Sequence, residues 1–189
     1  MKLFNMIFKR KVSASDSVMQ LLKASKANYV YKYHISGNWN DSVDGQYCVK
    51  TDTISIATYL SKERCNEVIL HELAHWSGRN TRLSRISILN AQLKGALSLM
   101  HDDMPYFYCL EEIIAQTTML KLARVLQLDN IAYYELNWES YLNSWERHAR
   151  NMSGERFDVN EAAKYAEEES DKAVSFLKRF MVESVAEAA

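Results

Sequence analysis

Two histidines four residues apart, with a glutamate directly after the first, are the strongest chemical signal in the sequence. Residues 71–75 read His-Glu-Leu-Ala-His, which is the H-E-x-x-H pattern. On a helix, positions i and i+4 lie on the same face, so His71 and His75 can direct two imidazole nitrogens at one point. Zinc accepts imidazole ligands, and a catalytic zinc keeps one position open for water. Glu72 would lie over that position and take a proton from the bound water.

A third ligand is expected from a second helix, predicted over residues 106–126. Its apolar interior carries Glu111 and Glu112, and carboxylates are rarely buried unless they are paired or bound to metal. One of them would complete a His₂Glu ligand set. We favour Glu112, because Gln116 follows one turn later on the same face and could accept a hydrogen bond from a ligand histidine. Glu111 is the alternative ligand. If Glu112 is the ligand, Glu111, like Gln116, would contact the ligand residues without binding the metal.

The H-E-x-x-H stretch is predicted to occupy the last two turns of a short buried helix. Apolar residues recur at helical spacing before and through the motif, from Cys65 to Trp76. Ser61 is a suitable N-cap, and Gly78 is a natural end for such a helix. The polar, basic segment 79–85 that follows is predicted to be a loop.

Three short segments ahead of the motif are predicted to be strands. They are residues 29–35, 46–50 and 53–57, the last with Ile54 and Ile56 facing the core and Thr53 and Ser55 on the opposite face. In zinc peptidases generally, an edge strand near the metal pairs with extended substrate, and strand addition is a general way to bind a peptide. Thr53, Ile54 and Ser55 are therefore our candidate substrate-binding residues. The alternative is that 53–57 is an ordinary strand of the sheet.

The rest of the chain is predicted to be largely helical. Helices are expected over residues 15–26, 86–100 and 137–151, with a long final helix capped by Asp158 or Asn160. Tyr141 and His101 are candidates for stabilising the oxyanion that forms during peptide hydrolysis. Together these elements indicate an α+β fold, mostly helical, with a small antiparallel sheet packed on the helix that carries the histidines.

Composition limits the class of protein. The chain has 189 residues, of which 48% are hydrophobic, and this favours one domain with a sizeable core over residues 1–189. Residues 1–45 would form an N-terminal extension packed on that domain. The net charge of −1, from 23 basic and 24 acidic residues, gives no electrostatic footprint for nucleic acid.

The cysteines and the first residues bear on localisation. Cys48, Cys65 and Cys109 form no C-x-x-C pair, which suits a reducing cytosol better than a disulfide framework. The apolar stretch 3–8 is too short for the core of a signal peptide, and basic residues follow it where a cleavage site should lie. We therefore expect a cytoplasmic protein with no membrane partner.

Several segments resemble one known family. Residues 71–85, HELAHWSGRNTRLSR, resemble the signature of the metallopeptidase domain of ArdC-type antirestriction proteins, which is H-E-L-x-H-W-T-G, a short loop and R-L-x-R. Residues 108–116 are similar to the Y-x-x-E-E-L-V-A-E helix of the family, and residues 52–54 match the strand before its first helix. With similar C-terminal segments at 137–145 and 161–177, the resemblance covers roughly residues 45–180.

The resemblance implies a zincin-like domain of the kind found in plasmid and phage proteins that counter host defences. By the match, His71 and His75 bind zinc, Glu72 is the catalytic base, and the pair Glu111–Glu112 contains the third ligand. We therefore expect a zinc metallopeptidase of gluzincin type, phage- or plasmid-encoded. It would act in the host cytosol on a protein or peptide substrate, such as a host defence protein.

The chain departs from the family in two ways. Family members usually have an N-terminal single-stranded-DNA-binding domain, whereas only some 45 residues precede the match here, so DNA binding is not carried over. The family's helix block ends in glutamate where this chain has the neutral Gln116, which would raise the basicity of a histidine less. The alternative function is therefore a catalytically weak or inactive zincin that inhibits a host defence protein by binding it.

Overall fold

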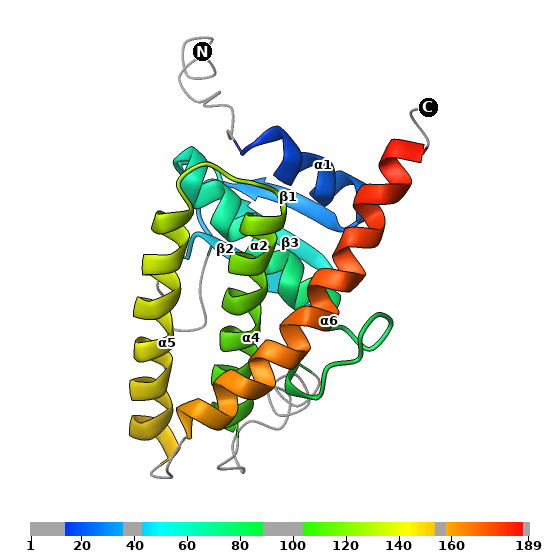
Figure 1. Ribbon diagram of the computed structural model, residues 1–189. Coiled ribbons are helices and arrows are strands. Elements are labelled where there is room, and N and C mark those ends of the chain that lie inside the picture. The colour runs from blue at the N-terminus through cyan, green and yellow to red at the C-terminus, as the bar shows by residue number, and fades with distance from the viewer. Residues whose placement is uncertain (1–13, 36–42, 89–103, 154–157, 187–189) are drawn as a thin grey trace.

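The computed structural model describes residues 14–35, 43–88, 104–153 and 158–186 (Figure 1). Within these ranges the secondary structure is mostly helical, with one small sheet. The elements in chain order are α1 (Asp16–Ala24), β1 (Asn28–Lys32), β2 (Gly45–Cys48), β3 (Thr53–Ala57), α2 (Lys62–Ser77), α4 (Met104–Val125), α5 (Ile131–Ser153) and α6 (Val159–Ala186). The expected α+β class is therefore confirmed.

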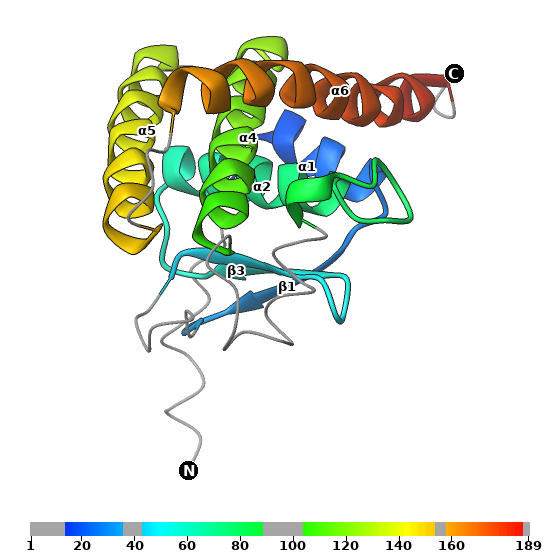
Figure 2. The ribbon, with the colours of Figure 1, turned by 90° about the horizontal axis from the view of Figure 1, so that it is seen from below.

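The central helix α2 begins and ends where its sequence predicts. Ser61 is its N-cap, and the Ser61 hydroxyl accepts a hydrogen bond from the backbone N–H of Arg64 at 3.2 Å. Gly78 ends the helix, with its own N–H bonded to the carbonyl of His75 at 2.9 Å. Because α2 is covered on several sides, nearly every residue from Cys65 to Ser77 is buried. Figure 2 shows α2 between the sheet and α6.

The sheet has the strand order β1-β3-β2 and is mixed. β2 and β3 form an antiparallel hairpin, whereas β1 runs parallel to β3. The prediction of an antiparallel sheet was therefore wrong for one of its two pairs. The physical reason lies in the connections. β2 and β3 are joined by a tight turn, which makes them antiparallel. Residues 33–44 between β1 and β2 are long enough for β2 to lie at the other edge of the sheet, so that β3 pairs in parallel with β1.

This strand order also corrects the proposed substrate strand. β3 is the middle strand, and its backbone pairs with β1 on one side and β2 on the other. Thr53, Ile54 and Ser55 therefore have no free backbone edge for a peptide, and their prediction as edge-strand residues was wrong. Ile54 and Ile56 are fully buried, as predicted, but Ser55 is buried too. The two edges of the sheet are β1 and β2.

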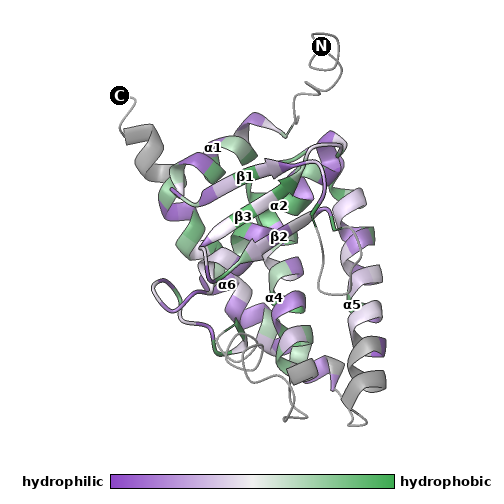
Figure 3. Ribbon diagram, turned by 180° about the vertical axis from the view of Figure 1, so that it is seen from behind, coloured by the Kyte–Doolittle hydropathy of each residue, from purple (hydrophilic) through white to green (hydrophobic). Residues whose placement is uncertain are grey.

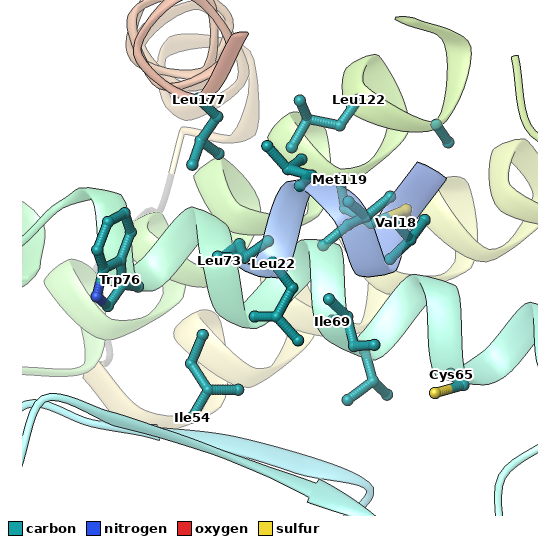
Figure 4. Packing of buried hydrophobic residues seen from close by; sticks show 14 of the residues in the cluster. Val18, Leu22, Ile54, Cys65, Ile69, Leu73, Trp76, Met119, Leu122 and Leu177 are labelled. Carbon is teal, nitrogen blue, oxygen red and sulfur yellow. The ribbon is translucent and has the colours of Figure 1, made fainter. Parts of the chain in front are cut away.

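The main hydrophobic core lies between the sheet, α1, α2, α4 and α6. Figure 4 shows Val18 and Leu22 of α1, Ile54 of β3 and Leu177 of α6 packed around the apolar side of α2. Figure 3 shows the sheet lying across α2, with hydrophobic residues along the helix. The N-terminal segment, described from residue 14, is thus part of the core through α1 and part of the sheet through β1.

The last three helices form a second layer of packing. α4 contacts α2, α5 and α6, and a second cluster joins α4 to the start of α6. α5 begins at Ile131, six residues before the predicted start, and Asp158 caps α6 by accepting from the backbone N–H groups of Asn160 and Glu161. Most of the predicted helix 86–100, and His101 after it, lie outside the described residues. None of the described helices is long and apolar enough to cross a membrane.

Candidate metal centre

Three ligand atoms from α2 and α4 converge on one point. The Nε2 atoms of His71 and His75 are 3.0 Å apart. Glu112 on α4 places Oε2 at 3.3 Å from the first of these nitrogens and Oε1 at 3.5 Å from the second. The i, i+4 spacing places the two rings edge-on to one another on one face of α2, and α4 crosses that face at the position of Glu112.

These separations fit a tetrahedral zinc. Ligands about 2.1 Å from a tetrahedral ion are about 3.4 Å from one another. The two histidine nitrogens are 3.0 Å apart, and they lie 3.3 and 3.5 Å from the two different oxygens of Glu112, so these separations lie around that value. With one oxygen taken for Glu112, the three ligand atoms lie within 4.8 Å of one another. Two imidazoles and one carboxylate also form a His₂Glu donor set, which leaves a fourth position for water or substrate. The described residues of this site therefore suit zinc in both donor type and spacing.

The charge around His75 points the same way. Burial would lower the pKa of this imidazole, but the carboxylates of Glu112, Glu111 and Glu72 raise it to about 9. The surroundings therefore favour a positive charge at the point where the ligand atoms meet. A divalent cation would meet that requirement without protonating the ring.

Glu111 lies behind His75 and not beside the ligand atoms. Its Oε1 is 3.1 Å from His75 Nδ1, and the fully buried Arg85 donates to both of its carboxylate oxygens. The Ser87 hydroxyl adds a fourth bond, to Glu111 Oε2, at 2.6 Å. Burial would raise the pKa of Glu111, but Arg85 and His75 lower it to about 2. Of the two candidate carboxylates, the structure brings Glu112 to the histidine Nε2 atoms and ties Glu111 to Arg85.

The end of α2 is shaped to admit the Arg85 guanidinium. A Cβ atom at Gly78 would lie 2.6 Å from Arg85 Nη2 and 2.7 Å from its Cζ, so any larger residue would displace it. The guanidinium also donates to the carbonyl of Ala74 and to the Ser77 hydroxyl. Gly78 therefore ends the helix and also makes room for the cation that holds Glu111.

Gln116 lies behind the other histidine. Its Oε1 atom is 2.9 Å from His71 Nδ1, as the sequence predicted for a residue one turn after Glu112. Its Nε2 atom is 3.3 Å from Oε1 of Glu67, a buried residue one turn before His71 on α2. Both histidines thus have a hydrogen-bonding partner on Nδ1, and both present Nε2 to the ligand set.

Glu72 is buried beside the ligand set. Burial raises the pKa of its carboxyl group, while the neighbouring imidazoles of His71 and His75 and the backbone N–H of Tyr47 act to lower it. A carboxylate with a raised pKa is better suited to accept a proton than one in water. The predicted base is therefore placed next to the two predicted ligands.

Strand β2 is the sheet edge that lies over Glu72. The Asp44 carbonyl accepts from the N–H of Ala57 on β3, so the alternating backbone groups of Gly45 and Tyr47 point away from β3. A Cβ atom at Gly45 would lie 2.4 Å from Val68 Cγ1 and 3.1 Å from Glu72 Oε1. The glycine therefore allows β2 to pass directly against α2 at the position of Glu72.

Tyr141 of α5 closes one side of the site. Its hydroxyl donates to Glu112 Oε2 at 2.6 Å, and its ring packs edge-on against His71 with a centroid distance of 5.8 Å. Burial and the charge of Glu112 raise its pKa well above the usual value, so the phenol keeps its proton. Tyr141 was one of two predicted oxyanion residues, and the other, His101, lies outside the described residues.

Sequence reasoning missed three residues that complete the site. Glu67 had a usable signal, because it is a carboxylate within the apolar run one turn before His71. Arg85 had only its place at the end of the R-L-x-R stretch, within the predicted loop 79–85. Gly45 had no signal, because it precedes the predicted strand 46–50. The roles of both residues depend on contacts with distant parts of the chain.

Comparisons with known proteins found no match for this chain among protein-family models, curated proteins or solved structures. The resemblance to ArdC-type proteins stays a prediction.

Proposed function

We propose that this protein is a zinc-dependent peptidase whose metal is held by His71, His75 and Glu112. One observation carries the proposal: the two histidine Nε2 atoms are 3.0 Å apart and each lies 3.3 or 3.5 Å from a different oxygen of the Glu112 carboxylate, close to the spacing expected around tetrahedral zinc. When bound, zinc would polarise the scissile carbonyl and lower the pKa of a coordinated water. The residues around the ligands supply the other requirements of the reaction.

Glu72 is the general base in this proposal. Its buried carboxylate adjoins both histidines, and it would accept a proton from the attacking water and pass it to the leaving amine. Tyr141 is our candidate for the hydrogen bond to the oxyanion: its hydroxyl keeps its proton, and it would turn from Glu112 Oε2, to which it donates in the structure, toward the oxyanion.

We assign substrate binding to β2 in place of β3. β2 is an edge strand and lies against Glu72, and the backbone groups of Gly45 and the carbonyl of Tyr47 face away from the sheet, while the Tyr47 N–H is bonded to the Glu72 carboxylate. An extended peptide could bind along such an edge through main-chain hydrogen bonds. The resemblance to ArdC-type proteins adds the cellular part of the proposal, which is a phage- or plasmid-encoded protein acting on a host defence protein in the cytosol.

The variant Glu72→Gln tests the chemistry. Zinc-loaded wild type is incubated with a proteome-derived peptide library, and the products are identified by mass spectrometry. We expect Glu72→Gln to keep the zinc content of the wild type and to lose cleavage by about 100-fold or more. Glu168→Gln, a change of the same kind at an exposed site, should cleave as the wild type does. Equal cleavage by Glu72→Gln and wild type would exclude this role for Glu72.

The second candidate function is inhibition by binding, without cleavage. The neutral Gln116 behind His71 favours it, because an amide raises the basicity of an imidazole less than a carboxylate does. Capture from a bacterial lysate separates the two functions. A protein retained by Glu72→Gln and cleaved by the wild type supports the peptidase, whereas a stable complex with uncleaved wild type supports the inhibitor.

A further inference from the structure

A chain of hydrogen bonds leads from His71 away from the ligand set. His71 Nδ1 is 2.9 Å from Gln116 Oε1, and Gln116 Nε2 is 3.3 Å from Glu67 Oε1. Gln116 and Glu67 are 3% and 4% exposed, so water does not compete freely for these contacts. Three side chains on the far side of Glu67 donate to its Oε2 atom, namely Arg64 at 2.9 Å, Asn137 at 3.2 Å and Tyr133 at 3.3 Å.

The chemistry of the groups fixes which one donates and which one accepts in each hydrogen bond. A carboxylate only accepts hydrogen bonds, so the end of the Gln116 amide that faces Glu67 must be the NH₂ group. The amide oxygen then faces His71 Nδ1 and requires a proton on that nitrogen. A neutral ring protonated at Nδ1 has its lone pair on Nε2, which is the atom in the ligand set.

We propose that Glu67 is a positioning residue for the metal, which acts through Gln116 to set the His71 tautomer that can bind zinc. This inference rests on the proposed function only in taking His71 as a ligand. It assigns to Glu67 a role that a purely structural buried carboxylate would not have. The donors on Oε2 keep Oε1 available for Gln116.

The single variant Glu67→Gln should reverse the chain. Arg64 only donates, so the new amide must turn its oxygen toward Arg64 and its NH₂ group toward Gln116. The Gln116 amide would then turn over and donate to His71 Nδ1. This would move the ring proton to Nε2 and block the ligand position. The double variant Glu67→Gln/Gln116→Glu should restore the direction, because a carboxylate at 116 accepts from both neighbours.

Two measurements follow the reversal. Zinc affinity is measured by competition with a chelator, and the His71 tautomer is read from ¹⁵N chemical shifts in metal-free protein at a pH where the ring is neutral. We expect Glu67→Gln to bind zinc about 10- to 100-fold more weakly and to protonate His71 at Nε2. The double variant should return to within about threefold of the wild type, with the Nδ1 tautomer. The matched control Glu168→Gln, the same change at an exposed site, should leave both readouts unchanged.

Two results would overturn the proposal. One is a folded Glu67→Gln protein that has the zinc affinity and His71 tautomer of the wild type. The other is a folded double variant that stays as weak as Glu67→Gln, since Glu67 would then act only in packing. If Glu67→Gln alone does not fold, the double variant against the wild type decides. Neither readout involves cleavage, so an inactive wild type would count against the peptidase and leave this test intact.

Discussion

The two histidines of α2 are held by different kinds of partner. His75, near the end of the helix, is bonded to the carboxylate of Glu111, which pairs with the fully buried Arg85. His71, one turn earlier, is bonded to the neutral amide of Gln116, and the nearest charge behind it is Glu67. The first arrangement brings an ion pair into the core, and the second keeps its charges further from the ring.

Because of this difference, substitutions next to the two histidines should affect different properties of the protein. A buried ion pair is costly to break, because the remaining charge has no water to solvate it. A buried amide that loses its partners costs less. We therefore expect changes behind His75 to act mainly on folding, and changes behind His71 to act mainly on the metal.

The largest effect is expected from Glu111→Gln. This variant leaves the Arg85 guanidinium buried without its carboxylate and should lower the free energy of unfolding by about 3–5 kcal/mol. Denaturant unfolding with a chelator present measures the change in the metal-free protein. The double variant Arg85→Met/Glu111→Leu removes both charges and should be more stable than Glu111→Gln. Equal or lower stability of the double variant would mean that the unpaired charge is not the cause.

The ion pair also predicts a dependence on acid pH. The pKa of Glu111 is about 2 in the folded protein, below the value of about 4.3 for an unfolded glutamate. Its contribution is therefore complete above about pH 5 and is lost as the pH falls through about 4 toward 2, with a size on the order of 3 kcal/mol. The free energy of unfolding is measured for the wild type and for Arg85→Met/Glu111→Leu at several pH values. The difference between the two proteins isolates the contribution of Glu111, since the other carboxylates titrate in both. A difference in free energy of unfolding between the two proteins that stays constant down to pH 2 would contradict this prediction.

The smallest effect on folding is expected from Gln116→Leu. It removes the amide that bonds His71 and Glu67 and should cost about 1–3 kcal/mol. Zinc affinity should nevertheless fall by about 10- to 100-fold, because His71 loses its orientation. Chelator competition and denaturant unfolding of the same sample compare the two effects. A Gln116→Leu protein as unstable as Glu111→Gln would remove the distinction between the two histidines.

The sequence predicted the parts of the site that depend on local geometry. Helical spacing placed His71 above His75, and the same spacing linked Gln116 to Glu112 on α4. The cap at Ser61 and the end at Gly78 also follow from residue preferences at helix ends, and both are confirmed. These features involve residues within one or two turns of each other.

The sequence did not predict contacts that depend on how distant segments pack. β3 lies between β1 and β2 because it pairs with β1, although β2 separates the two in the sequence. The alternation of apolar and polar residues predicts which segments are strands but not their order in the sheet. Arg85 was assigned to a polar loop because basic residues are rarely buried. It is buried only because Glu111, 26 residues later, lies opposite the space left by Gly78.

Zinc content tests the central claim most directly. Purified protein is saturated with zinc, freed of excess metal by gel filtration and analysed by mass spectrometry, alongside His75→Ala and Glu112→Ala. We predict about one zinc per chain in the wild type and little in either variant, since each removes one of three protein ligands. A wild type that retains no zinc, or variants that retain as much as the wild type, would contradict the assignment of this site.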